Sequence, residues 1–310
     1  RDRLGHVNEL LRIHPEVRAA LAAGTAVVAL ESTITTHGLP RPDNLDAARM
    51  SEAAVREAGA VPATVAVHDG HIRVGLSAGE LIELADARDI PKVSRQNLAG
   101  VLTRPGWGGT TVSATMIAAH LAGIDVFATG GIGGVHRGGE SSMDISADLG
   151  ELGRTPVTVV CAGPKSILDV GRTLEALETR GVPVVALGSD EVAGFYSRSS
   201  GHRAPLRVED PAEAAQLIAN QRALGLQTGV LITVPLPEAI ALPAEEVLAA
   251  VEHAEAEARA SGIHGPASTP FVLGRIAHIT EGRSVTANLE IIRRDALTAA
   301  RIAVALAELG

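Results

Sequence analysis

Aromatic side chains and an excess of positive charge are what this sequence most lacks. Phe, Trp and Tyr make up 2% of its 310 residues, and the formal net charge at pH 7 is −9. Proteins that bind nucleic acids need aromatic platforms for the bases or a basic surface for the phosphates. The composition therefore argues against a nucleic-acid partner. A small anion would bind only in a pocket whose local charge opposes that of the whole protein.

Cysteine and long apolar runs are also scarce. Cys161 is the only cysteine, so a disulfide within the chain and a zinc site built from several thiolates are excluded. We interpret Cys161, which lies on an apolar run, as a small core residue. Residues 1–21 are charged and amphipathic, unlike a signal peptide, and no apolar run reaches the length of a membrane span. We expect a soluble cytoplasmic protein without a membrane partner.

What the sequence does contain is an alternation of two hydrophobic patterns. Hydrophobic residues make up 46% of the chain. Short β-branched runs predict strands at 26–30, 64–67, 125–128, 157–161, 182–187 and 228–234. Segments rich in alanine and leucine predict helices at 44–57, 111–121, 166–179, 211–224, 244–260 and 285–309. Near-continuous apolar strands that alternate with helices predict an α/β fold, a single three-layer α/β/α domain over residues 1–310 with a central mostly parallel or mixed sheet.

Two familiar motifs are matched only in part. The segment GLSAG (75–79) fits the nucleophile elbow G-x-S-x-G, but Ser77 and Glu80 also form the S-x-x-E pattern of a helix capping box. No oxyanion segment precedes it, and we interpret it as a cap. The segment GPKS (163–166) resembles the end of a P-loop, yet Pro164 lacks the N–H that a phosphate cradle needs.

The lysine in VVCAGPKSILD (159–169) is the leading candidate for chemistry. Pro164 suits the first position of a helix, so we expect Lys165 in the first helical turn. There the positive end of the helix dipole and partial burial would both favour a neutral amine. A neutral amine attacks carbonyl carbons and forms Schiff bases. On this segment alone the alternative stays open, that Lys165 only neutralises a bound phosphate or extends to water.

Two further segments carry candidate acids and bases. The strand at 26–30 ends on Glu31, and apolar surroundings would raise the pKa of this carboxyl group and suit it to general-acid catalysis. Its alternative role is an ordinary helix or turn cap. Lys92 and Arg95 are suited to an anion, or else form a solvated basic turn.

The segment 128–149 combines many glycines with His136 and two aspartates. The glycines indicate a backbone that approaches a ligand closely. Asp144 and Asp148 are four residues apart, so they would share a helix face and could bind a hard metal ion through oxygen. The alternative is a solvated first turn.

Several long blocks together resemble one known family. They are LESTITTHGLP (30–40), TTVSATMIAAHLAGIDVFATGGIGGVHRG (110–138), SMDISADL (142–149), CAGPKSILD (161–169) and GRSVTANLEII (282–292). In this order they are similar to the pseudouridine-5′-phosphate glycosidases, also called the indigoidine synthase A-like family. The similarity extends from about Leu10 to Leu306, and linked blocks of this length are far more specific than one short motif.

The resemblance implies an activity and a set of site residues. The activity is reversible cleavage of the C–C glycosidic bond between uracil and ribose 5-phosphate, with a divalent metal that is typically Mn²⁺. Lys165 would be the nucleophile, Glu31 the proton donor, and Asp144 the metal ligand, largely through water. The substrate-binding residues that it implies are Lys92, the backbone around Val112, and Ser146, Ala147 and Asp148, with His136 and Asn288 as further pocket residues. It also implies an α/β/α homotrimer that acts on a small phosphorylated nucleoside.

The sequence departs from the family pattern at three places, one of which is HGPAST (264–269), where the lysine–glutamate pair common before Thr-Pro is absent. Gln96 and Asn97 stand where a second arginine and an aspartate are expected, and Arg294 and Asp295 stand where amides are more usual.

Two rival functions are a Schiff-base lyase of the aldolase kind and a non-catalytic sugar-phosphate-binding protein. Neither accounts for Glu31, the glycine-rich block and the Asp144 segment together.

Overall fold

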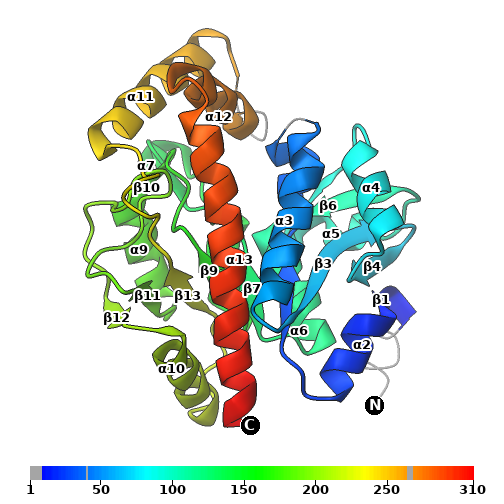
Figure 1. The fold of residues 1–310 in the computed structure, drawn as a ribbon. Helices are drawn as coiled ribbons and strands as arrows, with labels where there is room; N and C mark the ends of the chain where they lie inside the picture. Colours follow the sequence, from blue (N-terminus) through cyan, green and yellow to red (C-terminus); the bar gives the residue numbers. More distant parts are fainter. Residues whose placement is uncertain (1–8, 40, 264–267) are drawn as a thin grey trace.

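One continuous sheet forms the centre of the protein (Figure 1). The computed structural model describes residues 9–39, 41–263 and 268–310. The strand order is β1-β4-β3-β2-β7-β9-β13-β11-β12, with β6 paired to β3 and β5 paired to β6. The strands are β1 (Leu11–Ile13), β2 (Val27–Leu30), β3 (Val61–His68), β4 (His71–Val74), β5 (Lys92–Val93), β6 (Trp107–Thr110), β7 (Val126–Ala128), β9 (Thr158–Cys161), β11 (Val184–Leu187), β12 (Leu206–Val208) and β13 (Val230–Thr233). The sheet is mixed, because β3 pairs antiparallel with β4 and β6 while the run from β3 through β2 to β12 is parallel.

Helices cover both faces of the sheet. Helices α3 (Asp43–Glu57), α10 (Pro211–Ala223) and α13 (Arg283–Leu309) pack together on one face, and α2 (Pro15–Ala22), α6 (Val112–Ala122), α8 (Ala147–Leu152) and α9 (Val170–Thr179) lie on the other. The remaining helices are α4 (Ala78–Asp86), α5 (Arg95–Val101), α7 (Gly139–Ser142), α11 (Ala244–Ala260), α12 (Ser268–Ile279) and the π-helix η1 (Ile34–Gly38). A small sheet of β8 (Val135–His136) and β10 (Leu168–Asp169) lies apart from the main one. The predicted three-layer α/β/α arrangement is confirmed.

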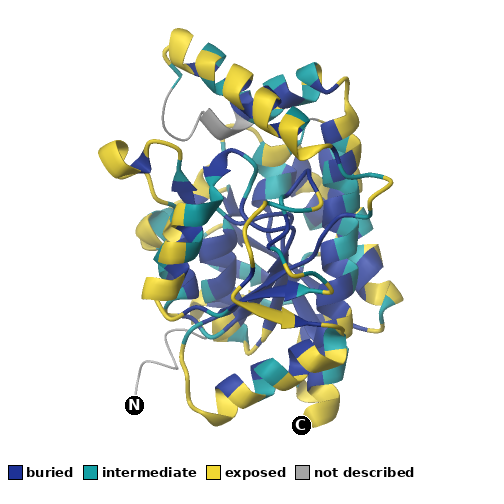
Figure 2. Ribbon diagram, turned by 90° about the vertical axis from the view of Figure 1, so that its left-hand side faces the viewer, coloured by how far each residue is buried: buried dark blue, intermediate teal, exposed yellow. Residues whose placement is uncertain are grey.

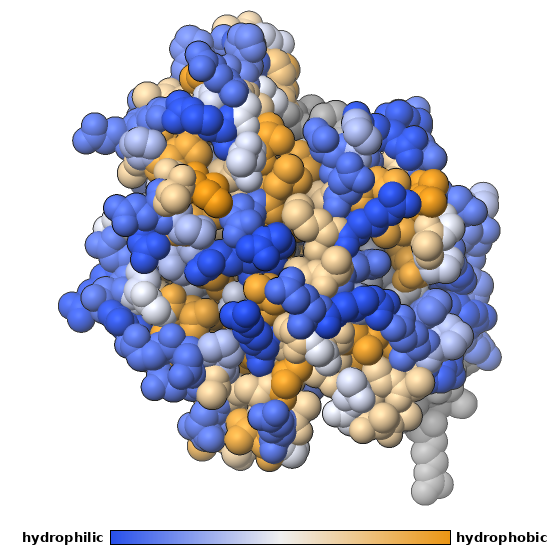
Figure 3. Space-filling model, in the orientation of Figure 1, coloured by the Kyte–Doolittle hydropathy of each residue, from blue (hydrophilic) through white to orange (hydrophobic). Residues whose placement is uncertain are grey.

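The apolar strands are buried on both sides, as their continuous hydrophobic runs predict. Successive side chains alternate between the two helix layers: Val28 of β2 packs with α3 and α13, and Ala29 packs with α6. Figure 2 shows the strands as a buried centre between helices whose outer faces are exposed. In the orientation of Figure 1, strongly hydrophilic side chains lie near the middle of the surface and also around its periphery, with apolar patches between them (Figure 3).

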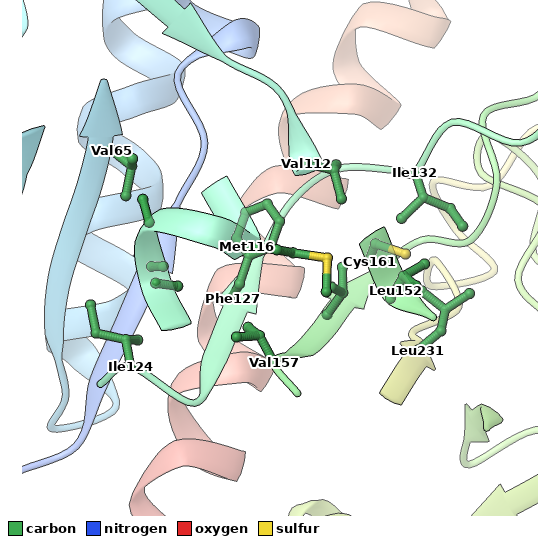
Figure 4. Close-up of a cluster of buried hydrophobic side chains, with 14 of the residues drawn as sticks. Val65, Val112, Met116, Ile124, Phe127, Ile132, Leu152, Val157, Cys161 and Leu231 are labelled. Atoms are coloured by element: carbon green, nitrogen blue, oxygen red, sulfur yellow. The ribbon is translucent and has the colours of Figure 1, made fainter. Parts of the chain in front are cut away.

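The core beneath α6 shows how an aliphatic protein fills its interior. Met116 of α6 lies beside the strand residues Phe127 and Cys161 (Figure 4), and all three have no exposed surface. Each large apolar side chain contributes about 1.5–3 kcal/mol when it is fully buried. Cys161 is a core residue as expected, and burial raises the pKa of its thiol.

The structure confirms the predicted strands and helices with one correction. The helix expected at 166–179 begins only at Val170, where the Asp169 side chain accepts a hydrogen bond from the Arg172 amide, 3.0 Å away. Before it, Leu168 and Asp169 form β10, which pairs antiparallel with β8. Ser77 and Glu80 form the capping box of α4, as interpreted from the sequence. None of the helices in the described residues combines the length and the apolar character that a membrane span requires.

The sheet reverses its winding between β2 and β7. From β2 the chain crosses through α3 to β3 on one side, and from β7 it crosses through α8 to β9 on the other. In open α/β sheets, ligands bind outside the carboxyl ends of the strands at such a reversal. Glu31 directly follows β2, and Thr129 directly follows β7.

Candidate active site

A pocket opens at the carboxyl ends of β2, β7 and β9, where the sheet reverses its winding. Its volume is about 660 Å³ when counted out to the mouth. Four of the predicted site residues line it, namely Glu31, Lys92, Lys165 and Asn288. They come from distant parts of the chain and converge because parallel strands end at the same edge of the sheet.

Lys165 lies on a tight turn just after β9, not on a helix. Its backbone amide donates a hydrogen bond to the Ile132 carbonyl (3.1 Å), and the Ile132 amide donates to the Gly163 carbonyl (3.2 Å). Gly163 has φ +93°, and a Cβ there would overlap the carbonyl oxygen of Ala193. The expected first helical turn at Lys165 is therefore wrong, and with it the helix-dipole argument for a neutral amine. Ile167 and Leu168 are buried in the core under α11 and α12, and the Leu168 amide donates a hydrogen bond to the Lys165 carbonyl (3.0 Å), which closes the turn.

Lys92 and Lys165 are the only two lysines in the chain, and both line this pocket. Every other Lys or Arg position is an arginine, which is not deprotonated in proteins. Lys92 is an exposed residue, but partial loss of solvent around its amine lowers its pKa, the nearby charge of Lys165 lowers it further, and the carboxylates of Glu31 and Asp148 raise it. The two amines are thus close enough to interact, beside one buried acid.

Glu31 is a buried carboxyl group, 9% exposed. The Thr129 hydroxyl donates a hydrogen bond to its Oε1 atom. Burial raises the pKa of Glu31, and the charge of Lys165 and the bond from Thr129 act against that rise. This direction agrees with the expectation from the sequence, and Glu31 is not a helix cap.

The π-helix η1 supplies a wall of the pocket that the sequence analysis did not foresee. Its residues Ile34, His37 and Gly38 line the pocket. His37 Nδ1 lies 2.7 Å from Thr36 Oγ1, and His37 Nε2 lies 3.2 Å from the Ile90 carbonyl oxygen. Burial lowers the pKa of His37, and so does the charge of Lys92, which together favour a neutral imidazole. π-helical turns are frequent at functional sites.

The glycine-rich segment was expected to approach a ligand, but other pocket residues were missed. Gly130 and Gly131 follow Thr129, and Phe195 and Leu273 complete the apolar lining. A signal for Thr129 existed in the sequence, because it directly follows a predicted strand, as Glu31 does. Phe195 and Leu273 carry no comparable signal, since their places depend on how loops and α12 pack over the sheet edge.

Ser146, Ala147 and Asp148 adjoin the pocket rather than line it. Ser146 caps α8, and its Oγ accepts a hydrogen bond from the Asp148 amide (3.2 Å). Asp148 is buried, and its carboxylate accepts hydrogen bonds from the amides of Ser113 (3.1 Å) and Gly133 (2.8 Å). A Cβ at Gly133 would overlap the Ser146 hydroxyl, so this glycine serves close packing within the protein.

Val112 is buried beside this group, at the first position of α6. Ser113, which follows it, donates its amide to the Asp148 carboxylate. The charge of Asp148 also acts on Glu31 and on Lys92. Asp148 is therefore near enough for its charge to act on two pocket residues, and Val112 directly precedes the residue whose amide binds it.

Asp144 and Asp148 do not share a helix face, which corrects the expectation of a paired metal site. Asp144 is exposed and precedes the helix that contains Asp148. Its backbone carbonyl accepts a hydrogen bond from the amide of His136 (3.0 Å), and neither residue is among those that line the pocket. No group of three or more His, Cys, Asp or Glu side chains in residues 9–39, 41–263 and 268–310 is placed to hold a metal ion. One carboxylate fits a divalent cation that keeps most of its water, as Mg²⁺ does, and does not fit a site made mainly of protein ligands.

The segment after Lys92 differs from the expected anion-binding turn. Arg95 forms an ion pair with Glu151 through two hydrogen bonds, and the Glu151 carboxylate has no exposed surface. The Arg95 guanidinium is therefore not free to bind an anion. Asn97 closes the capping box of α5, where its Oδ1 accepts from the Ser94 amide (2.8 Å) and its Nδ2 donates to the Lys92 carbonyl (3.0 Å). The amide at position 97 thus holds the turn that presents Lys92. Gln96 is exposed.

Comparison with known proteins agrees with the family resemblance of the sequence blocks over nearly the whole chain. The family described as "Indigoidine synthase A like protein" matches residues 16–305. The chain belongs to this family. The protein from Paracoccus denitrificans named pseudouridine-5′-phosphate glycosidase is 55% identical over 300 residues, covering 96% of this chain and 99% of its own. The protein of that name from Deinococcus radiodurans is 52% identical over 309 residues, covering 100% of this chain and 98% of its own.

Two solved structures share the fold. The prealnumycin C-glycosynthase AlnA, in complex with ribulose 5-phosphate, superposes with a TM-score of 0.90 at 38% identity, covering 97% of this chain and 98% of its own. An indigoidine synthase A-like protein from Thermotoga maritima superposes with a TM-score of 0.86 at 33% identity, covering 96% of this chain and 97% of its own. The family that the sequence blocks resemble is therefore confirmed.

Proposed function

We propose that this protein catalyses the reversible cleavage of pseudouridine 5′-phosphate to uracil and ribose 5-phosphate. The observation that carries the proposal is the convergence of the chain's only two lysines on one buried acid, Glu31, in a single pocket. Close relatives bear the name of this activity, and AlnA, named as a C-glycosynthase, binds a pentulose phosphate.

A lysine suits this bond because the sugar is joined to a carbon atom of uracil. Ordinary glycosidases use two carboxylates and a leaving group whose heteroatom is protonated. Simple cleavage here would expel a poorly stabilised carbanion. We propose that the Lys165 amine adds to the anomeric carbon while the ribose ring opens, so that nitrogen replaces the ring oxygen at that carbon.

The same nitrogen then drives the departure of the base. Its lone pair forms the C=N bond of a Schiff base as the bond to uracil carbon 5 breaks, and that carbon takes up a proton. Glu31, protonated over a wider pH range by its burial, would supply protons to the ring oxygen and to the uracil carbon. Water hydrolyses the Schiff base, releases ribose 5-phosphate and restores the Lys165 amine.

Phosphate binding would account for the local positive charge in an acidic protein. Lys92 would bind the phosphate together with the backbone at Val112 and the segment Ser146–Asp148, and helix N-termini favour anions. Asn288 and His136 would contact the remainder of the substrate. Asp144 would hold a hydrated Mn²⁺ or another divalent cation, which supplies positive charge to offset the phosphate. A homotrimer remains part of this proposal.

Borohydride trapping tests the covalent step. Intact mass is measured after incubation with ribose 5-phosphate and borohydride, and the modified peptide is then mapped. We expect one reduced pentose-phosphate adduct on Lys165 and none in Lys165→Arg. Because Lys92 is the one other lysine, Lys92→Ala is the matched control, and it should still form the adduct at saturating sugar phosphate.

Two outcomes would contradict the proposal. Detectable binding of ribose 5-phosphate without an adduct would favour a sugar-phosphate-binding protein. An adduct together with turnover of ketose phosphates, but no release of uracil from pseudouridine 5′-phosphate, would favour a lyase of the aldolase kind.

A further inference from the structure

A second cavity lies at the carboxyl ends of β11 and β13. Its volume is about 780 Å³ when counted out to the mouth. It is bordered by Gly188 after β11, by Val234 and Pro235 after β13, and by one side of α13. In the described parts of the chain it shares no lining residue with the pocket that contains Lys165.

Arginine side chains dominate the charge of this cavity. Arg198, Arg293, Arg294 and Arg301 all line it. Arg294 and Arg301 are two turns apart on α13 and therefore share a face of the helix. Such a concentration of positive charge is unusual in a chain whose formal net charge is −9.

Most of these arginines lack an acidic partner. Arg293 is paired with Glu290, at 2.9 Å. Within residues 9–39, 41–263 and 268–310, Arg198, Arg294 and Arg301 form no ion pair within 4 Å. Arg198 donates only to the Leu236 carbonyl oxygen (3.0 Å).

The acids closest to the cavity do not neutralise it. Glu209, which lines the cavity, is held by Arg207 through two hydrogen bonds of 2.7 and 3.0 Å. Asp295 adjoins Arg294 in sequence but is 1% exposed, and burial raises its pKa well above the ordinary value, which favours the neutral acid. Among the described residues, three of the arginines that line the cavity, Arg198, Arg294 and Arg301, therefore have no ion pair with a carboxylate.

The Arg294 side chain carries a second, independent sign of a missing partner. Its Nε atom is buried and has no hydrogen-bond acceptor among the described residues. Buried polar groups are almost always paired with protein, water or a ligand. An anion held in the cavity would provide the acceptor.

We propose that this cavity binds a small, multiply charged anion of the phosphate class, such as a phosphate monoester or a diphosphate. Planar guanidinium groups match pairs of phosphate oxygens, and a phosphate monoester carries about −1.5 to −2 charges at neutral pH. A ligand with a single carboxylate group carries too little negative charge to balance three arginines. The inference does not depend on the function proposed above, because it uses none of the same residues.

Isothermal titration with pyrophosphate in the Lys92→Ala protein tests the proposal. This background removes the cation that would bind phosphate in the other pocket. At constant ionic strength we expect one pyrophosphate per chain. Affinity should fall at least about tenfold in Arg294→Gln/Arg301→Gln, because charge-assisted hydrogen bonds are lost. The charge-matched control is Arg154→Gln. Arg154 is exposed and lies before the amino end of β9, whereas the cavity lies at the carboxyl ends of the strands, so this variant should bind as before.

Three results would overturn the proposal. They are no binding by Lys92→Ala, unchanged affinity in the double arginine variant, and an equal loss in Arg154→Gln. If the double variant does not fold, Arg198→Gln and Arg301→Gln, both at exposed residues, take its place. A change of oligomeric mass in the arginine variants, with no pyrophosphate binding by Lys92→Ala, would assign the arginines to a subunit contact instead.

Discussion

The Thr129 hydroxyl donates a hydrogen bond to the buried carboxylate of Glu31, and this contact joins the ends of two neighbouring parallel strands. Glu31 follows β2 and Thr129 follows β7, so the bond spans the place where the sheet reverses its winding. It stabilises the ionised form of an acid whose burial favours the neutral form. The fold thus sets the proton affinity of the proposed acid through two opposing contributions.

Removing the Thr129 hydroxyl should shift the pH dependence of turnover. In Thr129→Val the carboxylate loses a hydrogen bond to its charged form, so the pKa of Glu31 rises further. If Glu31 acts as the acid, the alkaline limb of kcat against pH should move to higher pH. Thr129→Ser, which keeps the hydroxyl, is the control and should leave the limb in place. An unchanged limb in Thr129→Val would mean that another group supplies the proton.

Removing the acid itself should reduce the rate and leave binding intact. Glu31→Gln keeps the size of the side chain and removes the titrating proton. A general acid contributes about 10²–10⁴-fold to a rate, so kcat for uracil release should fall by that order. KM should change little, and borohydride should still trap the ribose 5-phosphate adduct on Lys165 after a long incubation. Near-normal kcat would contradict the assigned role.

Gly163 should tolerate no side chain, because the turn that carries Lys165 needs a positive φ and close contact with the Ala193 carbonyl. Backbone strain of this kind costs about 1–3 kcal/mol, so Gly163→Ala should lower the free energy of unfolding by at least that amount. Gly100→Ala is the control, since nothing lies within 4 Å of a Cβ there and the residue is within α5. It should raise stability by about 0.5–1 kcal/mol. Equal stability of the two variants, measured by urea unfolding, would be inconsistent with this account.

Ser77 distinguishes a helix cap from a nucleophile. Ser77→Ala removes the acceptor for the Glu80 amide and should reduce stability by about 1 kcal/mol. Turnover of pseudouridine 5′-phosphate should be unaffected at temperatures well below unfolding. A large loss of turnover with unchanged stability would revive the nucleophile-elbow interpretation of GLSAG.

Asp295 should make the protein less stable as the pH rises. Its carboxyl group is 1% exposed, and burial raises its pKa well above the usual 3.8, against the opposing charge of Arg294. A group whose pKa is higher in the folded state binds its proton more tightly there, so stability is lost as pH rises from about 4 through the folded pKa. Asp295→Asn should therefore be more stable than the parent protein, with a gap that is wider at pH 8 than at pH 5.

Urea unfolding at the two pH values measures this gap. Asp190→Asn, at an exposed acid paired with Arg207, is the control, and removing that pair should not give a gain that grows with pH. A gap for Asp295→Asn that is constant with pH would show that Asp295 is ionised equally in the folded and unfolded protein.

Local features of the sequence were sufficient for the secondary structure and for part of the site. Continuous apolar runs identified β2, β7, β9 and β13, because strands buried on both faces need no polar positions. Glu31 was identified because it directly follows such a run, and Lys165 because it comes four residues after the end of one. The capping box at Ser77 could also be predicted, since the cap residue and its partner are only three residues apart in the sequence.

Tertiary structure decided the remainder, through contacts between residues far apart in the chain. Pro164 suggested a helix at Lys165, but the chain makes a turn there and Leu168 and Asp169 then pair with β8, so that the helix begins only at Val170. Arg95 was expected to be free for an anion, yet it pairs with Glu151, 56 residues away.

The acids of the glycine-rich segment show the same division. Nothing in the local sequence distinguishes Asp144 from Asp148. Only Asp148 is buried, because its two carboxylate oxygens accept hydrogen bonds from the amides of Ser113 and Gly133. The sequence alone determined which residues were chemically able to act and which strands would place them at one edge of the sheet. Only the packed structure decided which of them share a pocket, because burial, ion pairing and the reversal of the sheet depend on contacts that no local pattern contains.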